Sequence, residues 1–132
     1  MVSYRTPLGR ARGLGSAKHG AGHWISERVT SVALVPLSLW AVCSGLTLSK
    51  TGYDGVIDWL HAPLNAVLAM LLLAVGFQHM HAGLKVVVED YVHAPMQRSV
   101  LLLLNLFVCA FGGALAVFCI LKVALGPAVI PA

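Results

Sequence analysis

Three long apolar runs divide the chain, and shorter polar segments separate them. The runs cover about residues 29–48, 65–88 and 99–125. An α-helix rises about 1.5 Å per residue, so roughly 20 apolar residues are enough to cross the hydrocarbon core of a bilayer, which is about 30 Å thick. The pattern therefore predicts an all-α membrane protein with three transmembrane helices.

Local sequence signals mark the ends of these helices. Ser26 is a candidate N-cap for the first helix, because a serine oxygen can accept a hydrogen bond from the free N–H groups of a first turn. Gly126 and Pro127 end the third helix. Residues 49–63 and 89–98 each hold several charged residues and a proline, and both are predicted to be loops.

The composition excludes a soluble globular domain. Of 132 residues, 58% are hydrophobic and 11% are charged, whereas about 25% of the residues in soluble domains are charged. A chain this short has too little interior to bury such an apolar excess. Its three cysteines, Cys43, Cys109 and Cys119, lie inside the apolar runs without zinc-site spacing, so we expect small buried hydrophobic residues there.

Basic residues cluster ahead of the first apolar run and contribute to a net charge of +4. The cluster comprises Arg5, Arg10, Arg12, Lys18 and Arg28. By the positive-inside rule, the N-terminus and residues 89–98 face the cytoplasm or the matrix, and residues 49–63 and the C-terminus face the other side. No recognisable nucleic-acid-binding fold surrounds the cluster, so nucleic acid is not an expected partner.

The chain divides into two regions. Residues 1–22 are rich in Gly, Arg, Ser and Ala and contain no acidic residue. We expect them to form a basic flexible tail, although their composition also fits a transit peptide. Residues 23–132 are predicted to form a single three-helix transmembrane anchor domain in the lipid bilayer. The expected location is a bacterial inner membrane or, alternatively, a mitochondrial inner membrane.

The second apolar run contains residues that are costly at membrane depth, namely Gln78, His79, His81 and Lys85. A charged side chain at the centre of a bilayer costs about 3 kcal/mol to insert, so such residues tend to face protein, water or a cofactor. His79 and His81 point about 200° apart on a helix and cannot serve one ligand from the same face. His81 and Lys85 share a face that another subunit, lipid headgroups or water could cover.

Glycines flank His79 on its own face of the helix. Gly76 and Gly83 lie within about 60° of it, and Asp90 lies within about 20°. Two interpretations fit this stripe. His79 could be an axial ligand of haem iron, with glycines that let a flat macrocycle approach, or it could hydrogen-bond across the bundle while the glycines pack closely against another helix. The other two apolar runs contain no histidine, so a bis-histidine haem would need its second imidazole from another polypeptide.

A second cluster of polar and aromatic residues is expected at the inner membrane interface. His23, Trp24 and Arg28 precede the first run, and Asp90 and Tyr91 follow the second. A phenol and a guanidinium there can hydrogen-bond a quinone carbonyl or haem propionates, and a carboxylate can orient the ligand or exchange protons. The alternative is ordinary anchoring, since aromatic residues and arginine are common at membrane interfaces.

Two stretches at these clusters resemble a known family. They are HWISERVTSVAL (residues 23–34) and HMHAGLKVVVEDYVH (residues 79–93). Both are similar to the small hydrophobic membrane anchor of succinate dehydrogenase, which is respiratory complex II. The second stretch has a His, a Gly four residues later, and an Asp-Tyr pair eleven and twelve residues later. The resemblance extends over about residues 20–125.

The resemblance implies a three-helix anchor that pairs with a second membrane anchor, the cytochrome b subunit. An iron–sulfur subunit and a flavoprotein subunit lie above the pair, and the flavoprotein holds the succinate site. The family pattern implies that His79 is an axial ligand of haem b and that Asp90 and Tyr91 lie at the ubiquinone site. It places Arg28 near the haem propionates and the quinone. The implied function is membrane attachment and electron transfer from succinate to ubiquinone, with no catalytic residue for succinate oxidation in this chain.

Other classes of function stand beside this one. A fumarate reductase or another quinone-linked anchor uses the same architecture with the opposite direction of electron flow. A structural assembly subunit would hold no cofactor. A small transporter is disfavoured, because Lys85 and the histidines lack an acidic partner within the apolar runs.

Overall fold

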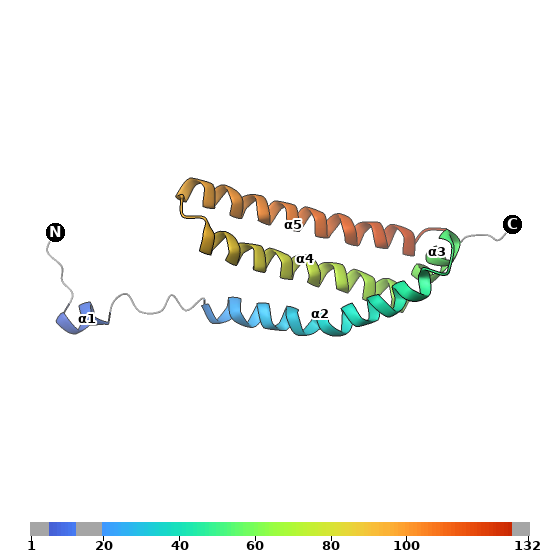
Figure 1. The fold of residues 1–132 in the computed structure, drawn as a ribbon, viewed down its shortest axis with the longest axis horizontal. Helices are drawn as coiled ribbons and strands as arrows, with labels where there is room; N and C mark the ends of the chain where they lie inside the picture. Colours follow the sequence, from blue (N-terminus) through green and yellow to red (C-terminus); the bar gives the residue numbers. More distant parts are fainter. Residues whose placement is uncertain (1–5, 13–19, 128–132) are drawn as a thin grey trace.

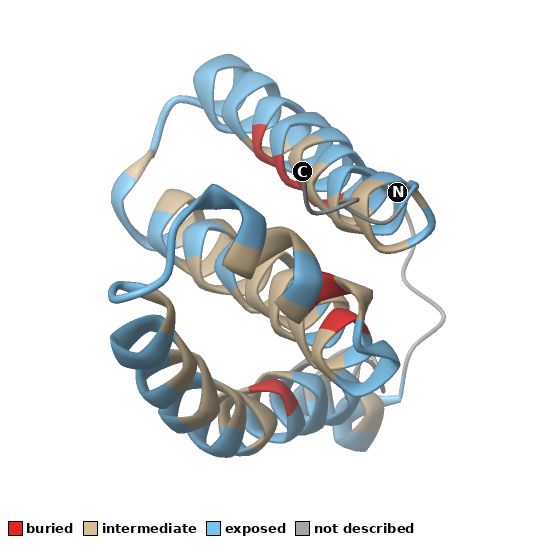
Figure 2. Ribbon diagram, turned by 90° about the vertical axis from the view of Figure 1, so that its right-hand side faces the viewer, coloured by how far each residue is buried: buried red, intermediate tan, exposed pale blue. Residues whose placement is uncertain are grey.

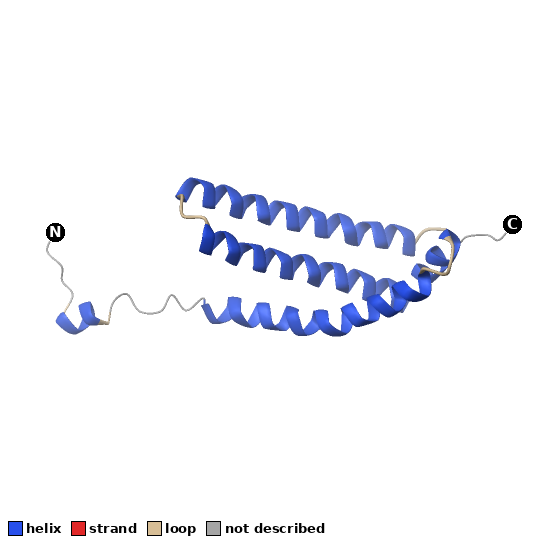
Figure 3. Cartoon of the chain, viewed as in Figure 1, coloured by secondary structure: helices blue, strands red, loops and turns tan. Residues whose placement is uncertain are grey.

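The computed structural model describes residues 6–12 and 20–127, and within these ranges the chain forms helices and no strand (Figures 1 and 3). A short helix lies near the N-terminus, three long helices follow, and another short helix connects the first two of these. The helices are α1 (Pro7–Ala11), α2 (Gly20–Leu48), α3 (Tyr53–His61), α4 (Pro63–Tyr91) and α5 (Pro95–Ala124). Of the tail predicted over residues 1–22, residues 1–5 and 13–19 lie outside the described residues.

Three helices are long and apolar enough to cross a membrane: Trp24–Leu48, Pro63–Tyr91 and Pro95–Ala124. The predicted all-α architecture with three spans is therefore confirmed. The chain passes through the bundle in alternating directions, so the start of α2, the end of α4 and the start of α5 lie at the same end (Figure 1). Which side of the membrane this end faces stays a prediction from the basic residues.

The first long helix begins before its predicted cap. Because α2 starts at Gly20, Ser26 lies inside the helix, and its prediction as the N-cap is wrong. Its carbonyl oxygen instead accepts a hydrogen bond from the Thr30 hydroxyl at 3.0 Å. α2 also curves along its length (Figure 1), and it contains Pro36, which lacks the N–H of a regular helix and is a common cause of bending.

The segment over residues 49–63 was expected to be a loop, but it contains the short helix α3. The Trp59 ring of α3 stacks on Trp40 of α2, with ring centroids 5.5 Å apart. Leu60 is buried, and the Asn65 side-chain amide donates a hydrogen bond to the Trp59 carbonyl at 3.0 Å. The loop prediction is wrong because the segment's polar residues occupy one side of a short helix whose apolar residues pack on the bundle.

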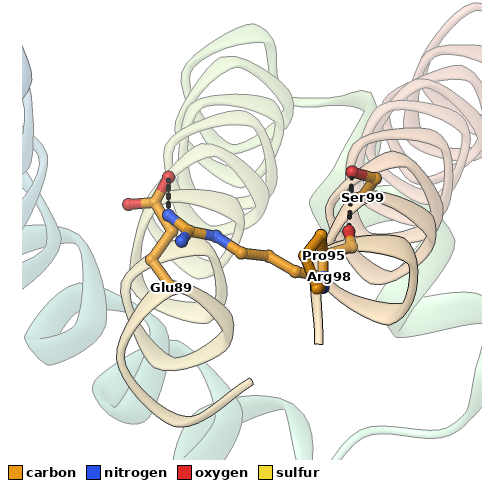
Figure 4. A network of polar contacts seen from close by, with 4 residues as sticks. All are labelled: Glu89, Pro95, Arg98 and Ser99. Carbon is orange, nitrogen blue, oxygen red and sulfur yellow. Dashed lines mark hydrogen bonds and ion pairs between the residues drawn. The ribbon is translucent and has the colours of Figure 1, made fainter. Parts of the chain in front are cut away.

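The second predicted loop is also shorter than expected, since only residues 92–94 separate α4 from α5. Pro95 occupies the first turn of α5, where its missing N–H leaves no helical hydrogen bond unmade. The Arg98 guanidinium lies 4.0 Å from the Glu89 carboxylate, and the Ser99 hydroxyl donates a hydrogen bond to the Pro95 carbonyl at 3.0 Å (Figure 4). The ion pair connects the last turns of α4 to the start of α5, whereas the Ser99 hydrogen bond lies within the first turns of α5.

α4 lies between α2 and α5 and contacts both (Figures 1 and 2). The contact with α5 is close where Phe77 lies over Gly112 and Gly113, because a Cβ built on either glycine would be 2.8 Å or 3.2 Å from the nearest Phe77 atom. Further along the same interface, the Asn105 side-chain amide donates a hydrogen bond to the His81 carbonyl at 3.0 Å. The α4–α5 pair is therefore joined by both steric fit and a polar contact.

Few side chains are buried by the chain itself (Figure 2). In the described residues, the buried positions are Thr30, Leu60, Ala66, Asn105, Cys109 and Gly113. Most apolar side chains of the three long helices are exposed, and in a membrane they contact lipid or other subunits. Cys109 is buried as expected, whereas Cys43 and Cys119 are exposed on this apolar exterior, which corrects the prediction for those two.

Candidate functional site

His79 makes a hydrogen bond between two of the spanning helices. Its Nδ1 atom lies 3.0 Å from the Thr30 hydroxyl oxygen, which joins α4 to α2. Thr30 is buried, with 8% of its surface exposed, and its hydroxyl oxygen also lies 3.0 Å from the carbonyl oxygens of Ser26 and Glu27. Within the described residues, Nε2 of His79 has no hydrogen-bond partner. It is not fully buried either, in contrast to Nδ1 of His81. The ring is thus held through Nδ1.

The glycines beside His79 have open space around them. A Cβ built on Gly76 or Gly83 would meet nothing within 4 Å in the described part of the chain. The tightly packed glycines are instead Gly112 and Gly113, against Phe77 of α4. The packing interpretation of the stripe is therefore right about the hydrogen bond across the bundle and wrong about close contact of these two glycines within this chain. Another molecule has room to approach the helix backbone there.

His81 lies on a different side of α4. Its side chain lines a groove of about 620 Å³ between α4 and α5, together with residues that include Phe77 and Cys109. Its Nδ1 atom is buried and, in the part of the chain that the structure describes, has no hydrogen-bond partner. The prediction that the two histidines face apart is confirmed. In this chain the neighbour of His81 is α5, and contact of this face with another subunit, headgroups or water stays a prediction.

Among the described side chains of the predicted interface cluster, no hydrogen bond, ion pair or cation–π contact joins the residues of α2 to those of α4. The Arg28 guanidinium lies 5.6 Å from the centre of the Trp24 ring, which is a cation–π distance. Asp90 and Tyr91 end α4 and are exposed, Tyr91 with 78% of its surface. Among the described residues, the ion pair found is that of Glu89 with Arg98, outside this cluster. A shared role for Arg28, Asp90 and Tyr91 therefore requires a ligand between them.

The cluster residues also lie at different levels of the bundle. The hydrogen bond between Thr30 and His79 marks where α2 and α4 pass each other. Arg28 precedes Thr30 by two residues, or about 3 Å of helix rise, whereas Tyr91 follows His79 by twelve residues, or about 18 Å. Because the helices are antiparallel, Arg28 and Tyr91 are about 15 Å apart along the axis. Arg28 is therefore much closer to the level of His79.

Sequence reasoning did not single out Thr30. A threonine inside an apolar helix often donates only to its own backbone, and Thr30 does so here as well. The available signal was a polar residue within the first apolar run, seven residues after His23 in a stretch already noted for its resemblance to a family. The contact itself depends on the rotation of α2 against α4, which hydropathy along one helix does not report.

Comparison with known families gives a match over residues 2–124, to the model of the succinate dehydrogenase/fumarate reductase transmembrane subunits. The chain belongs to this family. The resemblance noted for residues 23–34 and 79–93 is thereby confirmed. Because the family is one of transmembrane subunits and the structure has three candidate spans, the chain is an integral membrane protein.

Individual relatives match most of the length of this chain. The succinate dehydrogenase hydrophobic membrane anchor subunit of Paracoccus denitrificans is 28% identical over 132 residues, which are 98% of this chain and 99% of the relative. The subunit of the same name from Rickettsia conorii is 29% identical over 110 residues, or 83% of this chain and 87% of the relative. The subunit of the same name from Rickettsia felis is 33% identical over 91 residues, which are 68% of this chain and 75% of the relative. No solved structure gives a significant match.

Proposed function

We propose that this chain anchors a succinate dehydrogenase in the membrane, contributes one axial ligand to a b-type haem, and forms one wall of a ubiquinone site. Its partners are a second membrane anchor, an iron–sulfur subunit and a flavoprotein subunit that holds the succinate site. The relatives support this role, because they are named as succinate dehydrogenase hydrophobic membrane anchor subunits. The family description also names fumarate reductase, which is therefore the second candidate.

The observation that carries the haem proposal is the way in which His79 is held. A histidine that ligates a metal through one ring nitrogen usually hydrogen-bonds a protein group through the other. The Thr30 contact occupies Nδ1 and leaves Nε2 without a described partner. His81 lacks this arrangement, since its Nδ1 is buried without a partner beside α5. The geometry therefore favours His79 as the ligand.

The surroundings of His79 fit a haem. The open backbone at Gly76 and Gly83 lies on the same helix face and has room for a flat macrocycle. In the described ranges, no three His, Cys, Asp or Glu side chains gather as metal ligands. A haem iron takes a single axial side chain on each face, so one imidazole from this chain and one from the second anchor suffice. When bound, such a haem supplies one-electron redox chemistry within the membrane.

Arg28 is placed to hold the charged edge of the haem. It lies about 3 Å of helix rise from the level of Thr30 and His79, toward the end of the bundle that carries Asp90. A guanidinium binds carboxylates through charge-assisted hydrogen bonds, and among the described residues Arg28 has no carboxylate partner. Its guanidinium lies over the ring of Trp24, one helical turn nearer that end of the bundle. These observations support binding of the haem propionates.

Tyr91 and Asp90 are proposed to line the quinone site at the end of α4. The Tyr91 phenol is exposed and can donate a hydrogen bond to a quinone carbonyl oxygen, and Asp90 beside it can exchange protons with water. Pro95 and the ion pair of Glu89 with Arg98 limit the freedom of the adjoining connection (Figure 4). We place this end of the bundle on the cytoplasmic or matrix side, where the soluble subunits bind.

A matched pair of histidine variants tests the haem assignment. We expect the purified complex to show a low-spin b-type signal in its reduced-minus-oxidised spectrum. His79→Ala should abolish this signal or convert it to high spin, whereas His81→Ala should leave it largely intact, because the two imidazoles lie on different sides of α4. Loss of the signal in His81→Ala with retention in His79→Ala would transfer the ligand role to His81. Absence of haem from the wild-type complex would leave only the anchor role.

A further inference from the structure

We infer that Thr30 is a positioning residue, which sets the tautomer and the ring orientation of His79 so that Nε2 is the free ligand atom. The inference rests on the proposed haem ligation and adds a residue on a second helix to it. Its basis is the hydrogen bond between Thr30 and His79, together with the two backbone contacts of the same hydroxyl.

The hydroxyl of Thr30 has a single proton and three polar neighbours at 3.0 Å: Nδ1 of His79 and the carbonyl oxygens of Ser26 and Glu27. A carbonyl oxygen can only accept a hydrogen bond. If the proton pointed to Nδ1, two oxygen atoms would lie 3.0 Å from the hydroxyl oxygen with no proton between them. The arrangement is satisfied when the proton is shared by the two carbonyls and the hydroxyl oxygen accepts from Nδ1–H.

The tautomer follows from this assignment. A neutral imidazole that carries its proton on Nδ1 has its lone pair on Nε2, which is the form that binds a metal through Nε2. The Thr30 oxygen also draws the Nδ1 proton toward itself and makes the ring a more basic ligand. A more basic ligand stabilises the oxidised iron more than the reduced iron. The hydrogen bond is therefore expected to lower the reduction potential of a haem bound at His79.

The position of Thr30 suits this task. Its β-branched side chain has few rotamers in a helix, and the two carbonyl contacts hold its hydroxyl on the side of α2 that meets α4. Because Thr30 is buried, water does not readily compete for Nδ1. The orientation of His79 on α4 is thus determined from a second helix, which restricts rotation of the ring about its own side-chain bonds.

Three variants of the complete membrane complex test the inference. Thr30→Val replaces the hydroxyl by a methyl group of similar size, and Thr30→Ser keeps the hydroxyl. Ser31→Ala is the matched control, because the Ser31 hydroxyl donates to the Glu27 carbonyl at 2.7 Å, and no contact with His79 is found for it among the described residues. Two quantities are measured: the midpoint potential of the b-type haem, and the rate at which excess apomyoglobin removes the haem.

We expect Thr30→Val to raise the midpoint potential and to speed haem transfer by about tenfold or more. Thr30→Ser and Ser31→Ala should behave like the wild type. If Thr30→Val does not assemble, Thr30→Cys is measured in its place. A thiol is a weaker hydrogen-bond acceptor than a hydroxyl, so the midpoint potential should shift in the same direction by a smaller amount. A wild-type potential and transfer rate in the assembled valine or cysteine variant overturns the inference. Such a result leaves His79 as the ligand, whereas retention of low-spin haem in His79→Ala overturns the proposed ligation by His79, on which the inference rests.

Discussion

Alanine in place of glycine distinguishes contacts made within this chain from contacts made by other molecules. A Cβ at position 113 would lie 3.2 Å from Cβ and 3.3 Å from Cγ of Phe77, whereas a Cβ at position 76 would meet nothing within 4 Å in the described residues. Both glycines lie inside spanning helices. Gly113→Ala and Gly76→Ala are therefore chemically identical changes with different expected consequences.

The magnitudes follow from the atoms involved. Cβ and Cγ form the base of the Phe77 side chain, so a change of rotamer leaves the Cβ contact in place. To restore an ordinary separation of about 3.5–4.0 Å, α4 and α5 must move apart by roughly 0.5 Å at this point. Overpacking of this kind costs about 1–3 kcal/mol, against a gain in helix propensity of about 1 kcal/mol. Gly113→Ala should thus destabilise the fold by about 1 kcal/mol, and Gly76→Ala should not.

The assay compares the two variants in the purified complex. Thermal loss of the assembled complex is followed by size-exclusion chromatography, and haem content is measured per assembled complex. We expect Gly113→Ala to disassemble at a lower temperature with normal haem content. Gly76→Ala should instead lose haem, because its methyl group occupies the proposed haem face beside His79. Full haem content in Gly76→Ala would refute that face, and wild-type thermal stability in Gly113→Ala would refute the steric reasoning about Phe77.

Two further predictions concern the quinone site and the topology. Tyr91→Phe removes the hydroxyl that we propose donates a hydrogen bond to the quinone. Succinate-to-ubiquinone activity should therefore fall by about tenfold, while succinate oxidation by an artificial acceptor stays unchanged. An equal fall in both activities contradicts this role. Cysteines introduced singly at residues 54 and 93, after replacement of the native cysteines, should react with impermeant reagents from opposite sides of the membrane. Labelling of both from one side contradicts the proposed orientation.

Much of the architecture could be predicted from local patterns. Hydropathy located the three spans, because a bilayer requires about 20 consecutive apolar residues in any helix that crosses it. Helical periodicity separated His79 from His81, because the angle between two positions on a helix depends only on their spacing. The helix ends were harder to predict. The start of α2 was predicted too late, at Ser26, and α3 was predicted as a loop. Both errors arose because polar residues at an interface are compatible with both loops and helices.

The sequence by itself determined the three spans, the separation of the two histidines and the membership of a membrane-anchor family. Only the tertiary structure decided which partners the side chains have. It brought Thr30 of α2 to Nδ1 of His79, left Gly76 open, and packed Gly113 against another helix. The physical reason is that these contacts depend on the rotation and register of one helix against the next. Side-chain packing over the whole interface sets both quantities, whereas the pattern along a single helix does not contain them.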